Sequence, residues 1–257
     1  MAAALPAAPA SAYTTIGSSL IADASSAIAC GTPAQPDSFC TVAQTELPDR
    51  PTVAPADGVI VRWRIRSASG GTVRLRVLRP ADQGRFTGVG RSASEQVSGS
   101  GPGSDQVFSF VTRLPVRHGD FVGVDRQRRV GAIYHARAGQ EAYGLMTFQS
   151  PLAQGASRAP DEQSSGFELL LNADVEPDAD GDGFGDESQD NCPTVPNDQT
   201  TNPCPTPPPP PGDDDEVTNP EGPPQFHHHR RKRHHRPRRR GARRRADSFG
   251  YHQGSRR

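Results

Sequence analysis

The sequence is poor in the residues that build a hydrophobic core. Hydrophobic side chains make up 33% of the 257 positions, with one Trp, two Met and four Tyr, whereas Gly and Pro occupy 26 positions each. Because a folded domain needs enough apolar surface to offset the entropy lost on ordering, one core cannot extend through the whole chain. We therefore expect one folded region flanked by segments without a core of their own.

Motifs of catalysis and membrane insertion are also missing. There is no Gly-x-Ser-x-Gly, no His-Glu-x-x-His, no phosphate-binding Gly loop and no dinucleotide-binding fingerprint. His118, Asp120 and His135 accompany turn or strand-end patterns, which favours turn or surface roles. No run of about 18 apolar residues follows the N-terminal residues, so no span is expected in the mature chain. We expect a non-enzymatic protein, although an enzyme acting on wall polymers stays an alternative.

Charges of opposite sign are separated along the chain, although the formal net charge is zero. Residues 226–257 contain 13 of the 29 Lys and Arg but only one of the 29 Asp and Glu. Their net charge is therefore about +12, and the net charge of the rest of the chain is about −12. This tail, which we expect to be disordered, predicts nonspecific, salt-sensitive contact with polyanions; a solvated tail without a partner is the alternative. Residues 205–225 have the Pro-rich and acidic composition of a linker.

The N-terminus and the cysteines favour export. Residues 1–12 end in a small-x-small pattern of the kind that signal peptidase accepts, so we expect the remnant of a signal peptide; an unstructured Ala/Pro-rich terminus is the alternative. The four cysteines form two close pairs, Cys30 with Cys40 and Cys192 with Cys204. Since no Cys-x-x-Cys and no suitably spaced His accompanies them, they favour two disulfides over zinc, in a secreted or cell-surface protein.

Residues 13–174 carry the only sustained strand signal, an alternation of apolar and polar side chains broken by turn-forming residues. In its clearest stretch, one face carries Val59, Val61, Trp63 and Ile65, and the other carries Arg62, Arg64 and Arg66. The turn-forming residues Ser69-Gly70-Gly71 follow. The alternation then resumes with Val73, Leu75 and Val77. This predicts a hairpin with one buried face. Further strands are expected in 41–46, 106–112, 121–124, 130–135, 143–148 and 167–172, making an all-β, antiparallel sandwich or jelly-roll-like domain.

After residue 174 the composition changes to Asp, Gly, Asn and Pro, which cannot hold a fold by burial alone. One loop has carboxylates at its positions 1, 3, 5 and 9, which are Asp178, Asp180, Asp182 and Asp186. Gly183 stands at position 6, and Phe184 offers a backbone carbonyl at position 7. This alternation directs oxygens inward around a cation of the size of Ca²⁺. The pattern predicts an irregular calcium-binding loop, an acidic solvated linker being the alternative.

Residues 178–199, which read DADGDGFGDESQDNCPTVPNDQ, resemble a thrombospondin type 3 repeat, whose members follow DxDxDGxxDxxDNCPxxxNxDQ. The resemblance covers about 22 of the 257 residues. It implies that Asp178, Asp180, Asp182 and Asp186 bind calcium and that Cys192 forms a disulfide.

This sequence departs from the family pattern at two places. One inserted residue places Asp190 at position 13, where the family has a ligand at position 12, and the segment 197–199 is one residue shorter. We retain Asp190 as a candidate ligand. We take residues 175–204 as the repeat, and the domain in front of it resembles, by general pattern, β-rich domains of secreted actinobacterial proteins.

These features predict a secreted or cell-surface, non-catalytic calcium-binding protein of structural or adhesion type. The alternative is a carbohydrate-binding sandwich of the cell envelope that binds cell-wall or extracellular glycans. Such a module would use Trp63, Tyr134 or Tyr143 as a stacking platform, although Trp63 shares its face with Val59 and Ile65 and so fits a core position better.

Overall fold

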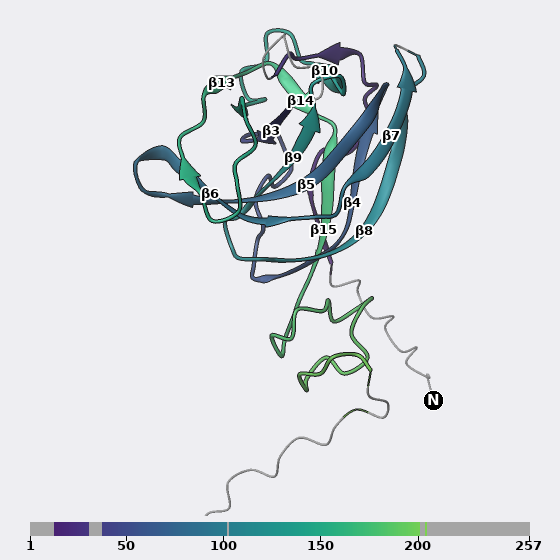
Figure 1. Ribbon diagram of the computed structural model, residues 1–257, viewed down its shortest axis with the longest axis vertical. Helices are drawn as coiled ribbons and strands as arrows, with labels where there is room; N and C mark the ends of the chain where they lie inside the picture. The colour runs from purple at the N-terminus through teal and green to yellow at the C-terminus, as the bar shows by residue number, and fades with distance from the viewer. Residues whose placement is uncertain (1–12, 31–37, 102, 201–203, 205–257) are drawn as a thin grey trace, which may run out of the picture. The chain divides into compact units, whose positions relative to one another are not determined.

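The computed structural model describes residues 13–30, 38–101, 103–200 and 204 (Figure 1). All regular elements in these residues are strands, apart from one short 3₁₀ turn at Asp82–Gly84. The predicted all-β antiparallel class is confirmed. The expected signal-peptide remnant (1–12), linker (205–225) and basic tail (226–257) lie outside the described residues. No helix of the described part of the chain is long and apolar enough to cross a membrane.

The first sheet has four antiparallel strands, in the order β1–β15–β4–β8. They are β1 (Thr14–Gly17), β15 (Leu171–Glu176), β4 (Gly58–Ser67) and β8 (Gln106–Val116). On the outer face of this sheet, Arg62 and Arg64 both pair with the buried carboxylate of Asp174, at 2.7 and 2.8 Å. These ion pairs join β4 to β15, the strand that runs into the acidic loop.

The second sheet is larger and curls around the opposite side of the core (Figure 1). Its order is β12 (Ser157–Arg158), β6 (Arg85–Arg91), β5 (Ser69–Ala81), β9 (Phe121–Gln127), β3 (Phe39–Gln44), β11 (Leu145–Phe148) and β13 (Glu162–Ser164), with β7 (Glu95–Ser100) also paired to β5. A third, small sheet is β14 (Phe167–Leu169), β10 (Ala132–Ala136) and β2 (Ser26–Ala27). Six strands were not expected from the sequence: β1, β2, β6, β7, β12 and β13. The single strand expected in 167–172 is instead two strands, β14 and β15, which belong to different sheets.

The predicted hairpin of residues 59–77 is wrong. β4 pairs with β15 and β8, whereas β5 pairs with β6, β7 and β9, so these consecutive strands belong to different sheets. The chain crosses between the sheets at Ala68, which is fully buried and whose N–H donates to the Ala132 carbonyl at 2.9 Å. The residues expected to form a turn begin β5 instead. Trp63 of β4 and Leu75 of β5 belong to the same core and are both removed from water, which favours the crossing.

The apolar face of β4 is also not the regular one that the alternation predicts. The register shifts between Ile60 and Arg62 opposite β8, so Ile60 joins Trp63 and Ile65 in the main core and Val61 does not. Trp63 is fully buried and lies 4.7 Å from the Phe110 ring, which confirms its expected core position. The β-bulge leaves the Val61 side chain beside Gly185 in the acidic loop.

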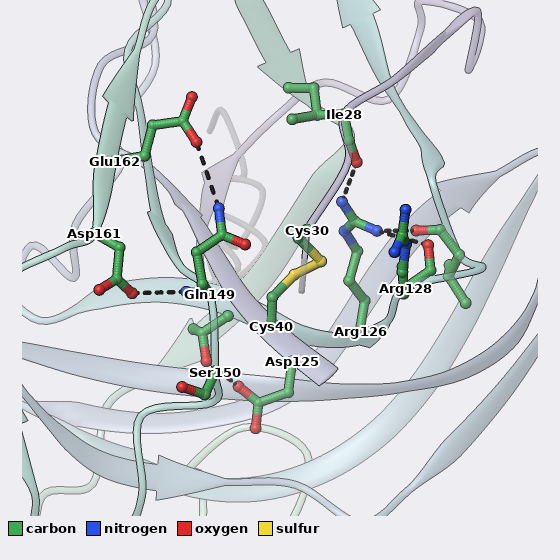
Figure 2. Close-up of a disulfide and its surroundings, with 12 residues drawn as sticks. Ile28, Cys30, Cys40, Asp125, Arg126, Arg128, Gln149, Ser150, Asp161 and Glu162 are labelled. Atoms are coloured by element: carbon green, nitrogen blue, oxygen red, sulfur yellow. Dashed lines mark hydrogen bonds between the residues drawn. A yellow bond between two sulfur atoms is a disulfide. The ribbon is translucent and has the colours of Figure 1, made fainter. Parts of the chain in front are cut away.

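Two disulfides are present, Cys30–Cys40 and Cys192–Cys204, as the spacing predicts. Figure 2 shows the first, which links the segment after β2 to β3. Next to it, Arg126 of β9 extends to the main chain and donates to the Val130 carbonyl at 2.8 Å and to the Ile28 carbonyl. Disulfides of this kind indicate an oxidising compartment.

Candidate metal centre

An irregular loop follows β15 directly and brings three carboxylates together. Ligand atoms of Asp178, Asp180 and Asp182 lie within 4.8 Å of one another, and each of these residues is partly exposed. Like charges at this separation repel in the absence of a cation. The group is therefore arranged as a site that could hold a metal ion.

Local hydrogen bonds explain why an Asp-x-Asp-x-Asp-Gly sequence folds in this way. The two Asp178 oxygens accept from the N–H groups of Gly181 (3.0 Å) and Gly183 (3.1 Å). Asp180 Oδ1 accepts from the Asp182 N–H at 3.1 Å. Gly181 and Gly183 have φ values of 78° and 85°, in the left-handed region where other residues are strained. The alternating acids and glycines thus wind the chain around its own carboxylates.

Two carboxylate oxygens of this loop are left without a partner. Asp180 Oδ2 and Asp190 Oδ2 are buried atoms with no hydrogen-bond donor. Burial raises the pKa of the Asp180 carboxyl above its ordinary value, and the charges of Asp182, Asp190 and Asp178 raise it further. A buried acceptor without a donor is costly, and a cation would satisfy both the oxygen and the charge. The donor set therefore fits an oxygen-preferring ion.

The remaining candidate ligands lie outside the group of three. The Asp186 carboxylate accepts from the Ala179 N–H at 3.1 and 3.3 Å, which closes the loop on itself. Asp190 Oδ1 accepts from the Cys192 N–H at 2.7 Å and from Gln199 Nε2 at 2.6 Å. Of Asp190, only Oδ2 is available for another partner.

Phe184, whose carbonyl is expected at position 7, lies in the same loop. Its side chain has a defined contact, because the Arg113 guanidinium of β8 lies 4.0 Å from the centre of the ring. Gln189 Nε2 donates to the Thr112 carbonyl of the same strand at 2.7 Å. These attachments to the sandwich were not predicted, because no periodic pattern marks which loop residue will meet which strand.

The stacking platforms of the carbohydrate-binding alternative are mostly inaccessible. Tyr134, expected to be exposed, is fully buried in the core, and its hydroxyl accepts from Arg126 Nε at 3.2 Å. The expectation was wrong because the Tyr134 side chain points from β10 into the main core. Trp63 is buried as well. Tyr143 is partly exposed, with the Arg137 guanidinium 5.3 Å from the centre of its ring.

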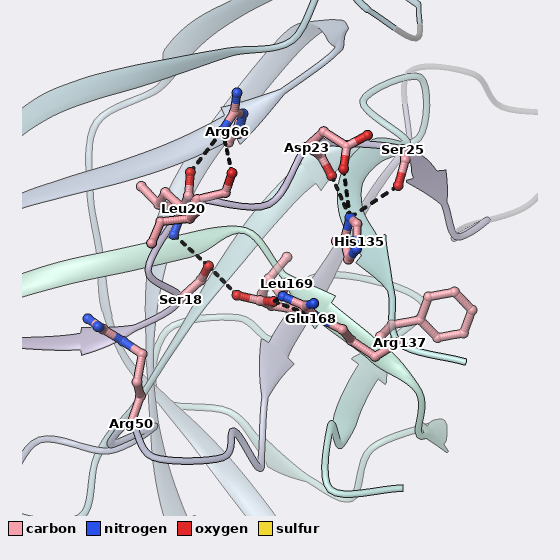
Figure 3. A network of polar contacts seen from close by, with 12 residues as sticks. Ser18, Leu20, Asp23, Ser25, Arg50, Arg66, His135, Arg137, Glu168 and Leu169 are labelled. Carbon is pink, nitrogen blue, oxygen red and sulfur yellow. Dashed lines mark hydrogen bonds and ion pairs between the residues drawn. The ribbon is translucent and has the colours of Figure 1, made fainter. Parts of the chain in front are cut away.

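A Ser, a His and an Asp meet near the start of the domain, as Figure 3 shows. His135 Nδ1 lies 2.9 Å from Asp23 Oδ1 and 3.3 Å from Ser25 Oγ. In a nucleophile relay the hydroxyl and the carboxylate contact opposite ring nitrogens, so that the imidazole passes a proton between them. Here both oxygens approach the same nitrogen. The contact therefore tethers residues 23–25 to β10 and does not form such a relay.

No protein-family model, curated protein or solved structure matches this chain. What the sequence and the structure together establish is an all-β domain of antiparallel sheets, stabilised by a disulfide and continued by a loop that carries a group of three aspartates.

Proposed function

We propose that this is a secreted or cell-surface protein of structural or adhesion type, in which residues 175–204 form a calcium-binding repeat of the thrombospondin type 3 kind. It has no catalytic role. Calcium holds the segment after the sandwich in one conformation, so that whatever follows in the chain is attached through a stiff joint rather than a flexible one.

The observation that carries this proposal is the buried Asp180 Oδ2, which has no hydrogen-bond donor and lies in the group formed with Asp178 and Asp182. A solvated acidic linker, the simpler interpretation of the sequence, would turn such an oxygen toward water. A bound cation gives the oxygen a partner and cancels the repulsion among the carboxylates.

The ion would be held by oxygens from a short stretch of chain. The residues are the carboxylates of Asp178, Asp180, Asp182 and Asp186, the carbonyl of Phe184 and the remaining oxygen of Asp190. Ca²⁺ accepts six to eight oxygens in flexible geometry, whereas Mg²⁺ demands a near-ideal octahedron, so this irregular loop favours Ca²⁺. Extracellular modules bind it with a Kd on the order of 10⁻⁴ to 10⁻³ M, which suits the calcium available outside cells.

Export is supported by the two disulfides and by the small-x-small pattern in residues 1–12. Outside the cell, extracellular glycans or anionic polymers are the partners that a structural protein of this kind would meet. The basic residues of 226–257 would give salt-sensitive contact with the anionic ones.

Calorimetric titration with calcium tests the proposal. The variant Asp180→Ala with Asp182→Ala should bind no calcium, because it removes two of the three grouped carboxylates. Glu187→Gln is the matched control, since it removes one charge from the same loop without touching the group, and it should bind as the unsubstituted protein does. Unchanged calcium binding in the double variant would refute the proposal.

A further inference from the structure

The acidic loop that follows β15 is attached to the sandwich by a buried carboxylate that is not one of the candidate ligands. Glu176, the last residue of β15, is 4% exposed. Its Oε2 accepts from the N–H of Glu187 at 3.1 Å and of Ser188 at 2.9 Å. Both donors belong to the loop, eleven and twelve residues further along the chain. A carboxylate withdrawn from water is therefore satisfied by the main chain of the repeat.

Gly185 shows how closely the loop lies against the sheet at this point. A Cβ atom at Gly185 would come within 2.5 Å of both Glu176 Oε2 and Val61 Cγ1, so a side chain there would displace these two side chains or the loop itself. The Val61 contact exists because the bulge in β4 turns this residue out of the main core. The absence of a side chain at Gly185 lets the loop backbone lie against the Glu176 and Val61 side chains without displacing them.

The backbone contact continues from Gly185 to the candidate ligands. The Gly185 carbonyl accepts from the N–H groups of Gln189 and Asp190, both at 3.0 Å. The Asp186 N–H donates to the Pro177 carbonyl at 3.0 Å, just after β15. Residues 185–190 thus form one hydrogen-bonded turn, and the Asp186 N–H joins it to the main chain just after β15. Both Asp186 and Asp190, the candidate ligands outside the group of three, lie in this segment.

We infer that Glu176 is a positioning residue for the calcium site: by accepting two loop N–H groups, it holds residues 185–190 so that Asp186 and Asp190 face the group of three aspartates. The inference rests on the proposed function. It states further that the affinity for calcium is set partly by the sandwich, through a side chain that does not touch the ion. Residues that orient metal ligands in this way typically contribute on the order of 10- to 100-fold to metal affinity.

The test compares calcium affinity by calorimetry in three variants of the full chain. Glu176→Ala removes the acceptor and should weaken binding about tenfold or more. Glu176→Gln keeps an oxygen that can accept the same two N–H groups, and should restore most of the affinity. Glu168→Ala removes a sandwich carboxylate that is equally buried and that accepts from Ser18 and Arg137 (Figure 3). It should destabilise the fold but leave the affinity unchanged.

Gly185→Ala provides a second route if Glu176→Ala does not fold. It retains every candidate ligand and Glu176, yet its methyl group displaces the Glu176 carboxylate or the loop and so disrupts their contact; it should also weaken binding about tenfold or more. Unchanged affinity in Glu176→Ala or, if that variant does not fold, in Gly185→Ala would overturn the inference while leaving the calcium site intact. Absence of calcium binding by the unsubstituted protein would instead end the proposed function, and this inference with it.

Discussion

Calcium should stabilise the sandwich as well as the loop. With a Kd between 10⁻⁴ and 10⁻³ M, raising free calcium from a chelated solution to about 10 mM adds about 1.4 to 2.7 kcal/mol to the free energy of unfolding, provided that unfolding destroys the site. For a domain of this size, that raises the unfolding midpoint by about 3 to 10 °C.

The structure indicates that unfolding of the sandwich does destroy the site. The acidic loop is bonded to β15 through Glu176 and to β8 through Gln189, and Arg113 of β8 covers the ring of Phe184. When these strands separate, the loop loses the surface against which it is ordered. The metal's binding energy is then coupled to the stability of the core.

The single Trp makes this coupling measurable. Trp63 is fully buried in β4, so its fluorescence reports unfolding of the sandwich and not of the loop. Thermal unfolding is followed by Trp63 emission in a chelator, in about 10 mM calcium and in the same concentration of magnesium, with the disulfides intact. Magnesium should have a smaller effect. An unchanged Trp63 midpoint in calcium, in a protein that calorimetry shows to bind the ion, would refute the coupling.

Two further predictions concern the sandwich itself. Asp125→Ala should lower the free energy of unfolding in urea by about 3 to 5 kcal/mol, because Asp125 and its partner Arg76 are both buried and the variant leaves the Arg76 cation unpaired. Asp161→Ala, which removes a half-exposed partner of Arg158, should lower it by less than about 1 kcal/mol. Equal losses in the two variants would contradict this reasoning. For Asp174, burial raises the pKa, but hydrogen bonds from Arg64, Thr15 and Arg62 outweigh it and hold the pKa below its ordinary value. The stabilising contribution of Asp174 is therefore present above about pH 4 and is lost as the pH falls through its folded-state pKa. The difference in free energy of unfolding between the unsubstituted protein and Asp174→Asn should accordingly shrink in acid. A difference that does not change with pH would contradict this.

Much of the secondary structure could be predicted from local pattern. Strand periodicity located β3, β4, β8, β9 and β11 to within a few residues, and turn formers correctly marked His118 and Gly119. The pattern did not identify β6 and β7, because they are rich in Gly, Ser and charged residues and have few apolar positions to alternate. Their strand conformation comes from pairing with β5, which no local signal reveals.

The pairing of β4 with β5 failed for a different reason. Two amphipathic strands separated by a Gly-rich stretch fit a hairpin and a crossing between sheets equally well, since both give the same alternation. Only the packing of Trp63 against Phe110 and of the second sheet over it decides between them. Tyr134 was misjudged likewise, because its exposure depends on neighbours that are distant in sequence.

The sequence alone determined the features that depend on near neighbours: the strands with clear alternation, the two disulfides of closely spaced cysteines, and a loop in which alternating Asp and Gly gather three carboxylates. The tertiary structure decided what depends on distant segments. It placed β4 and β5 in separate sheets, turned Val61 out of the main core toward the loop, and set Glu176, Thr112 and Arg113 against the loop. Local pattern reflects the geometry of a few bonded residues, whereas these contacts exist only after the sheets have packed.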